Sequence, residues 1–300
     1  MTQRPWLPNL IIAGAPKAGT SSLYRWIADH PDAFGSTEKE TYFFVDPGTH
    51  MYRPNFHISN GLDSYQAQFP IPAGSSPKVV LESTPGYMYS RTALEHIADL
   101  PSKPRCLFVL REPASQIYSL YSYFRGNWDW IPSDMDFGDF VKTVRSGSHS
   151  FKGNELAVNA LSYARYIEYL VPWWERLGAD RMKIILFDDL KADEMATTRL
   201  ISNWLELDPD FYDDYEFGRD NETYIPRNAL IQKINIAGRN LLPKGRVYET
   251  LRSLYRRANT RKPDGPTETE RAVIADLRSE FSSANGKLAE FFKLDVSSWA

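Results

Sequence analysis

The sequence has little cysteine, little excess charge and no long apolar run, and each shortage excludes a class of protein. The one cysteine in 300 residues, Cys106, cannot form an intrachain disulfide, so the chain suits a reducing compartment. It lies at the start of an apolar stretch, which predicts a buried and inert thiol. The formal net charge of −3 argues against general nucleic-acid binding, because such binding needs a basic excess.

Signals for membrane insertion and for metal binding are also missing from the sequence. The N-terminal residues contain no apolar segment of a signal peptide, and no apolar run approaches the length of a membrane span. The five histidines are scattered without the spacing of metal ligands. We therefore expect neither a membrane span nor a bound metal.

The most informative stretch that is present is a turn of small residues between an apolar run and a helical pattern. Residues 10–13 predict a buried strand, and residues 14–19 predict a tight turn. Residues 20–29 predict a helix whose apolar side chains share one face. The N–H groups and the dipole at the start of such a helix attract an anion.

The lysine of this turn distinguishes it from a P-loop. In the pattern Gly-x-x-x-x-Gly-Lys-Ser/Thr, Gly14 and Gly19 fill the glycine positions, but Thr20 stands where the lysine belongs. Lys17, inside the turn, is expected to lie over a single terminal group and its bridging oxygen. An ordinary strand–turn–helix with a surface lysine is the alternative, since short glycine motifs also match by chance.

With two later segments, the turn resembles the sulfotransferases that use 3′-phosphoadenosine 5′-phosphosulfate (PAPS). In that family a Lys-x-Gly-Thr-Ser loop binds the 5′-phosphosulfate, as residues 17–21 would here. Residues 107–124 are similar to the strand, Arg-x-Pro and helix that hold the 3′-phosphate. Residues 39–44, Lys-Glu-Thr-Tyr-Phe-Phe, resemble a segment of the heparan-sulfate and bacterial branches whose Glu is the proposed base. The matches span residues 9–124, with weaker likeness to residue 299.

The resemblance implies a role for each matched residue. Glu40 would be the general base, and Lys17 would stabilise charge on the bridging oxygen of the leaving nucleotide. The acceptor would be a hydroxyl or amine of a carbohydrate or small metabolite, sulfated by in-line transfer without a metal. Two other readings stay open: Glu40 as a surface carboxylate paired with a lysine, and Arg111 as part of a structural ion pair. The residues expected to bind PAPS are Lys17, Ala18, Gly19, Thr20, Ser21, Ser22, Arg111 and Ser119.

Alternating strands and helices predict an α/β fold, with a P-loop-like parallel β-sheet flanked by helices in a single domain over residues 1–300. Strands are expected at 10–13, 78–82, 105–110 and 183–187. Parallel sheets bind ligands at the carboxyl ends of their strands. Glu40, Ser83, Arg111 and the Lys17 turn should therefore gather at one edge. The irregular stretches 46–78 and 126–155 are expected to form acceptor-cleft loops.

Further helices are predicted from apolar periodicity and capping residues. They are expected at 90–100, 136–144, 156–177, 193–205, 268–281 and 285–292. An acidic run at 208–222 and a basic run at 239–262 are read as solvated faces. The alternative for the basic run is contact with an anionic acceptor or with the 3′-phosphate.

Several positions depart from the resembled family. Ser83 follows Glu82 where the heparan-type enzymes often carry a lysine, and Tyr42 replaces a histidine two residues after the base. The disulfide loop of Golgi members cannot form, and their membrane anchor is missing, so we expect a cytoplasmic and bacterial enzyme. These departures bear on the acceptor more than on the chemistry. Two rival functions remain: a P-loop kinase that uses ATP and Mg²⁺, and a non-catalytic protein that binds nucleotide or glycan.

Overall fold

Five parallel strands form the sheet at the centre of the protein. The computed structural model describes residues 6–128, 130–218, 225–226, 259–261 and 265–299. The strand order across the sheet is β2-β3-β1-β4-β5, and every pairing is parallel. The predicted parallel sheet is confirmed, with one further edge strand, β2. The bounds are Leu10–Gly14 for β1, Ala33–Gly35 for β2, Val79–Glu82 for β3, Arg105–Leu110 for β4 and Met182–Leu186 for β5.

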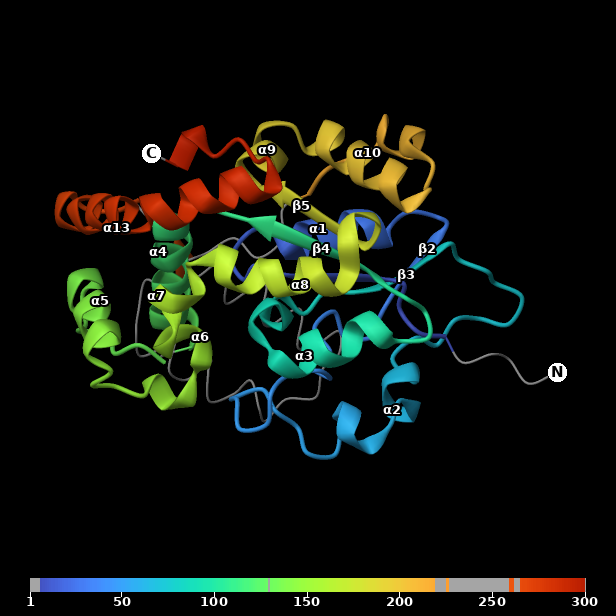
Figure 1. Cartoon of the computed structure of the whole chain (residues 1–300), viewed down its shortest axis with the longest axis horizontal. Helices are drawn as coiled ribbons and strands as arrows, with labels where there is room; N and C mark the ends of the chain where they lie inside the picture. The colour runs from blue at the N-terminus through green and yellow to red at the C-terminus, as the bar shows by residue number, and fades with distance from the viewer. Residues whose placement is uncertain (1–5, 129, 219–224, 227–258, 262–264, 300) are drawn as a thin grey trace.

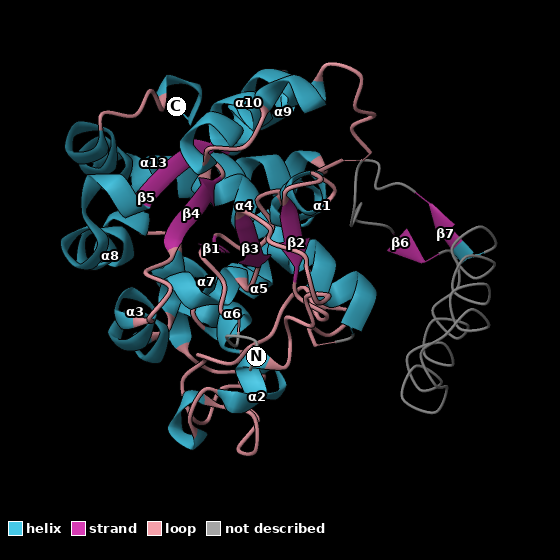
Figure 2. Cartoon of the chain, turned by 90° about the vertical axis from the view of Figure 1, so that its right-hand side faces the viewer, coloured by secondary structure: helices cyan, strands magenta, loops and turns pink. Residues whose placement is uncertain are grey.

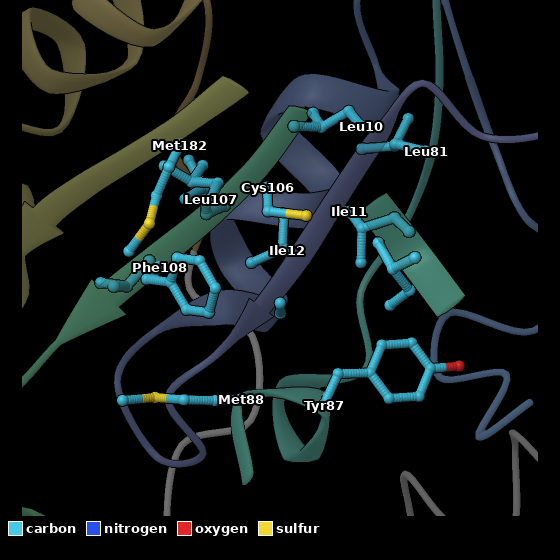
Figure 3. Close-up of a cluster of buried hydrophobic side chains, with 14 of the residues drawn as sticks. Leu10, Ile11, Ile12, Leu81, Tyr87, Met88, Cys106, Leu107, Phe108 and Met182 are labelled. Atoms are coloured by element: carbon cyan, nitrogen blue, oxygen red, sulfur yellow. The ribbon is translucent and has the colours of Figure 1, made fainter. Parts of the chain in front are cut away.

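The apolar runs of the sequence form the middle of this sheet. β1 lies between β3 and β4, and its residues 10–13 are fully buried. Strands covered on both faces need continuous apolar sequence, which is what residues 10–13 and 106–110 supply. Figure 3 shows Leu10, Ile11 and Ile12 of β1 beside Cys106 and Phe108 of β4 in this core. Cys106 is a free, buried thiol whose pKa burial raises, as an inert core residue requires.

Helices cover both faces of the sheet. In both cartoon views α9 and α10 lie on one side of the strands and α3 on the other (Figure 1, Figure 2). Helix α1 contacts α10 on the first side, and α8 contacts both α3 and the strands β4 and β5. The bounds are Thr20–Ala28 for α1, Arg91–His96 for α3, Tyr166–Arg181 for α8, Phe187–Ala192 for α9 and Glu194–Leu205 for α10.

A second buried cluster lies beside the sheet, and its described residues come mainly from helices and from no strand of the sheet. It includes Ile117 of α4, Phe140 of α5 and Phe281 of α13. The contacts of α13 with α4, α5 and α8 join this cluster to the rest of the chain. The bounds are Pro113–Tyr123 for α4, Phe137–Ser146 for α5, Glu155–Val158 for α6, Ala160–Tyr163 for α7 and Glu268–Phe292 for α13; the short α2 spans Asp63–Gln66, β6 Ile225–Pro226 and β7 Thr260–Arg261.

Side-chain caps fix several helix starts where the sequence predicts them. Ser90 accepts a hydrogen bond from the amide of Ala93, and Asp136 accepts one from that of Asp139. Asp193 caps α10 in the same way. Such caps satisfy amides that the first helical turn leaves unpaired.

The predicted long helix over 156–177 is wrong, because the chain breaks there into α6, α7 and α8. Asn159 and Arg165 leave the helical region at the two junctions. The opposite error occurs at the C-terminus, where 268–281 and 285–292 form one continuous helix, α13. Burial of Phe281, Asn285 and Leu288 along this helix outweighs the weak helix propensity of Gly286.

Three other expectations concern loops, charge runs and membranes. The stretch 126–155 contains α5, which matches the helix predicted over 136–144. In the acidic run, Asp210 and Asp213 pair with Arg199 at the surface. Apart from residues 259–261, the basic run at 239–262 lies outside the described residues. In the part of the chain that the structure describes, no helix is long and apolar enough to cross a membrane.

Candidate active site

The turn between β1 and α1 is held by neighbouring backbone and side chains. The amide of Ala15 donates to the carbonyl of Val109 at 2.8 Å, and Nε2 of Gln116 donates to the carbonyl of Pro16 at 3.0 Å. Lys17 and Gly19 both adopt left-handed backbone, with φ of 64° and 84°. A Cβ at Gly19 would lie 3.0 Å from the ring of Phe187, so this position needs glycine for conformation and for space.

This turn forms one wall of a cavity of about 610 Å³. Glu40 and Arg111 line the same cavity, which confirms that these segments meet at the carboxyl ends of the strands. Ala18 is fully buried behind the lining. Ser83 lies at this edge as predicted, and its amide donates to the carbonyl of Lys39 at 2.9 Å, but the residue is buried and does not line the cavity. The predicted residues that line the cavity are Lys17, Gly19, Thr20, Ser21, Ser22, Glu40, Arg111 and Ser119.

Lys17 lies in an apolar and positively charged environment. Its Nζ is 3.7 Å from the centre of the Tyr123 ring, a cation–π distance. Burial is the main cause that lowers the pKa of Lys17 to about 7, and the nearby Arg111 adds to the effect. Glu40 acts in the opposite direction, and Lys39 lowers the pKa a little further. The amine is therefore close to its midpoint at neutral pH.

Arg111 projects from the end of β4 toward the turn. Its Nη1 donates to the carbonyl of Lys17 at 3.2 Å, and its guanidinium lies 5.1 Å from the centre of the Phe187 ring. The hydroxyl of Tyr166 donates to the Arg111 carbonyl and fixes the backbone there. Burial lowers the pKa of Arg111. Within the described ranges it forms no ion pair with a carboxylate, so its charge faces the cavity.

Glu40 is held by two neighbours in sequence. The hydroxyl of Tyr42 donates to Oε2 of Glu40, and Nζ of Lys39 lies 2.8 Å from Oε1. Burial and the Glu40 charge raise the pKa of Tyr42, so the phenol stays a donor. Tyr42 has a left-handed φ of 55°, which brings its side chain back toward Glu40. The pairing of Glu40 with a lysine is thus present, and it occurs in the wall of the cavity.

A second carboxyl at the end of β3, Glu82, is sealed inside the protein. It accepts hydrogen bonds from the hydroxyls of Tyr65 at 2.5 Å, Thr84 at 2.7 Å and Thr41 at 3.1 Å. Burial raises its pKa, and these three hydrogen bonds oppose the rise. Glu82 has no exposed surface and does not line the cavity. Its place in the fold is structural.

The far end of the cavity is lined by residues that sequence reasoning did not single out. Tyr89 and Tyr163 stack with ring centres 4.0 Å apart, and Trp128 and Trp130 stack at 5.2 Å. We call these four side chains the aromatic wall. Only the loop assignments at 46–78 and 126–155 pointed to this region, because periodicity and motifs cannot show which distant aromatic residues meet. No group of three or more potential metal-ligating side chains occurs among the residues that the structure describes.

Comparison with known proteins supplies a family and a fold. A family model described as "Sulfotransferase domain" matches residues 7–216. The bifunctional heparan sulfate N-deacetylase/N-sulfotransferase 1 of Caenorhabditis elegans is 27% identical over 210 residues, covering 68% of this chain and 22% of the relative. Its human namesake is 27% identical over 203 residues, covering 66% of this chain and 22% of the relative. The chain thus spans about a fifth of the length of these curated relatives.

A solved structure extends the fold comparison over the chain. A sulfotransferase from Alicyclobacillus acidocaldarius has a similar fold, with a TM-score of 0.66, 18% identity, and coverage of 98% of this chain and 99% of that one. The predicted α/β fold class is therefore confirmed.

Proposed function

The chain belongs to the sulfotransferase domain family, and we propose that it transfers a sulfuryl group from PAPS to a hydroxyl or amine of a carbohydrate or small metabolite. The observation that carries this proposal is that Lys17, Glu40 and Arg111, from three separate segments, line one cavity. The relatives' names describe N-sulfotransferases of heparan sulfate. We infer the transfer of a sulfuryl group from that similarity, and we infer the acceptor from the residues that line the cavity.

The residues of the donor end fit an anionic nucleotide. Helix α1 begins at Thr20 with no side-chain cap on its first turn, and the left-handed Gly19 keeps that turn free of a side chain. Lys17 and Arg111 place two cationic groups beside it. Lys17, the amides of residues 18–22 and the hydroxyls of Thr20, Ser21 and Ser22 would hold the 5′-phosphosulfate. Arg111 and Ser119 would hold the 3′-phosphate.

PAPS, when bound, supplies a sulfuryl group whose bond to the bridging oxygen of the 5′-phosphate is broken. Glu40 takes the acceptor proton as the acceptor oxygen or nitrogen forms its bond to sulfur. Lys17 stabilises the negative charge that develops on the bridging oxygen. Both groups are positioned in advance, Glu40 by Tyr42 and Lys39 and Lys17 by its turn, and such positioning lowers the barrier to an in-line displacement.

The test of this proposal separates binding from turnover. We expect PAP, the desulfated product nucleotide, to raise the melting temperature of the protein more than ATP with Mg²⁺ does. Glu40→Gln should lower transfer of ³⁵S-sulfate from PAPS by at least about a hundredfold, because the general base is lost, while PAP affinity is nearly unchanged. The control is Glu38→Gln, since Glu38 is exposed and outside the cavity lining. A Glu40→Gln enzyme with full turnover would refute the role of Glu40, and preference for ATP with Mg²⁺ would refute the proposed donor.

A further inference from the structure

The two ends of the cavity differ in the elements that form them and in their charge. In both cartoon views α9, which supplies Phe187, lies on one side of the sheet, and α6 and α7 lie on the other (Figure 1, Figure 2). The described cationic lining residues Lys17, Arg111 and Lys191 lie in the turn, directly after β4 and in α9. The carboxylate of Glu194 at the start of α10 lines the cavity as well. The end beyond Glu40 is formed by the aromatic wall and by the segments around residues 46–51 and 155–156.

The aromatic wall offers apolar ring surface at this far end. The Tyr89 and Tyr163 rings are parallel within 2°, and those of Trp128 and Trp130 within 18°. Phe124 packs against Trp130 with ring centres 5.0 Å apart, which supports the second pair from behind. Rings held in this way lose little freedom when a flat ligand stacks on them or meets their edges.

Two carboxylates stand next to the aromatic wall. Glu155 accepts from the amide of His50 at 3.2 Å and pairs with Nδ1 of the same residue. Asp46 accepts from the Ser90 hydroxyl at 3.0 Å and from the amides of Arg91 and Thr92 at 3.0 and 2.7 Å. The two carboxylates are thus kept charged by fixed partners.

The pKa directions agree with this geometry. Burial alone would raise the pKa values of both carboxyls, but the hydrogen bonds to Asp46 and the His50 contact to Glu155 lower them. His50 is the one basic group at this end of the described lining. Its Nδ1 contacts Glu155. Its ring packs edge-on against Trp130, with the ring centres 5.1 Å apart.

Resting on the sulfotransferase function proposed above, we infer that the acceptor is an uncharged molecule whose ring lies against the aromatic wall, and not a polyanionic glycan chain. An acidic polysaccharide would bring its anionic groups beside Asp46 and Glu155, where like charges repel. An uncharged ring meets no such repulsion and gains contact with the aromatic wall. A neutral sugar and a phenol share this chemistry, so the test contains both.

The experiment compares acceptors that differ by one charge. With the full chain and saturating PAPS, ³⁵S transfer is measured to 4-nitrophenyl β-D-glucoside and to its glucuronide. The phenolic pair is methyl 4-hydroxyphenylacetate and 4-hydroxyphenylacetate. A chain of partly N-deacetylated heparosan, in which the glucuronate carboxylates outnumber the free amines, is the polyanionic arm. We expect the uncharged member of at least one pair to have a kcat/KM at least about tenfold above its anionic partner and above the chain.

Variants identify the cause of that preference. Glu155→Gln should narrow the ratio between uncharged and anionic partners several-fold, because one repelling charge is removed. Trp130→Ala should lower kcat/KM for both partners alike. The control is Glu168→Gln, since Glu168 is exposed on α8 and outside the lining, and it should leave the ratio unchanged.

Three outcomes would overturn the inference. The first is a higher kcat/KM for the anionic members or for the heparosan chain than for the uncharged members. The second is a ratio between uncharged and anionic partners that Glu155→Gln leaves unchanged. The third applies if no acceptor is sulfated: binding to the PAP-loaded protein is then followed by tryptophan fluorescence, and the inference is wrong if neither uncharged compound binds. A protein that fails to bind PAP instead refutes the proposed function.

Discussion

Binding of the donor nucleotide should be coupled to the uptake of a proton by Lys17. In the free protein, burial and Arg111 lower the pKa of this lysine to about 7, so a large part of the amine is neutral above that pH. The phosphate of bound PAP would face the amine and favour its charged form, which raises the pKa again. A group whose pKa rises on binding takes up protons, and the affinity for the ligand then falls as pH increases.

The magnitude follows from the pKa. At pH 8 a group with a pKa of 7 is about nine-tenths unprotonated, so binding should take up about 0.9 proton, against about 0.5 at pH 7. The same shift weakens PAP affinity about fivefold between pH 7 and pH 8, or about 1 kcal/mol. The phosphates of PAP change little in this range, because with a second pKa near 6 they are already about nine-tenths ionised at pH 7 and almost completely ionised at pH 8.

Calorimetry at pH 8 in two buffers with different ionisation enthalpies measures the uptake directly. Lys17→Met should abolish it. Lys183→Met is the matched control, because burial also lowers the pKa of Lys183 and its Nζ lies 5.4 Å from the Trp204 ring, but it does not line the cavity. Proton uptake that is absent from the natural protein at pH 8, or that survives in Lys17→Met, would refute the reasoning.

Two further variants test how the site is held. Tyr42→Phe removes the hydroxyl that donates to Glu40. We expect kcat to fall about tenfold while PAP affinity is unchanged. An unaltered kcat in steady-state assays would show that this hydrogen bond does not contribute to turnover. Gly19→Ala forces a side chain into left-handed backbone beside a ring 3.0 Å away, and should cost about 2 kcal/mol in chemical denaturation and weaken PAP binding. Gly147→Ala shares the left-handed strain, at φ 62° and ψ 21° with open space around it and outside the cavity lining, and should lower stability only; equal loss of PAP affinity in both variants would contradict this account.

The sequence predicted which segments meet around the Lys17 turn because the determinants of that region are local. An apolar strand, a glycine turn and a helix start are consecutive in the chain, and the strand that ends at Arg111 is equally continuous. Parallel strands then bring their carboxyl ends together, which predicts that Glu40 and Arg111 lie at the Lys17 turn. Ser83 obeys the same rule, because its amide bonds the carbonyl of Lys39, but local sequence does not show that it is buried beneath the cavity lining.

The aromatic wall could not be predicted because its residues meet only through tertiary packing. Tyr163 reaches the cavity because the predicted helix over 156–177 breaks at Asn159 and Arg165, and the apolar periodicity of that stretch conceals the break. The cation–π contact of Lys17 with Tyr123 is likewise non-local. Capping residues marked helix starts reliably, but no local signal marked these junctions.

The position of Glu40 is determined by the interior of the protein more than by its own loop. Thr41 is tied to the buried Glu82, and the amide of Phe43 donates to the hydroxyl of Tyr87 at 2.9 Å. These contacts fix the backbone on the inner side, so the side chain of the preceding residue, Glu40, is left facing the cavity. The carboxyl at the strand end is therefore the anchor, and the one in the loop lines the cavity. A Lys-Glu-x-x-Phe-Phe segment without such an anchor would match the same pattern without placing its Glu in the cavity wall.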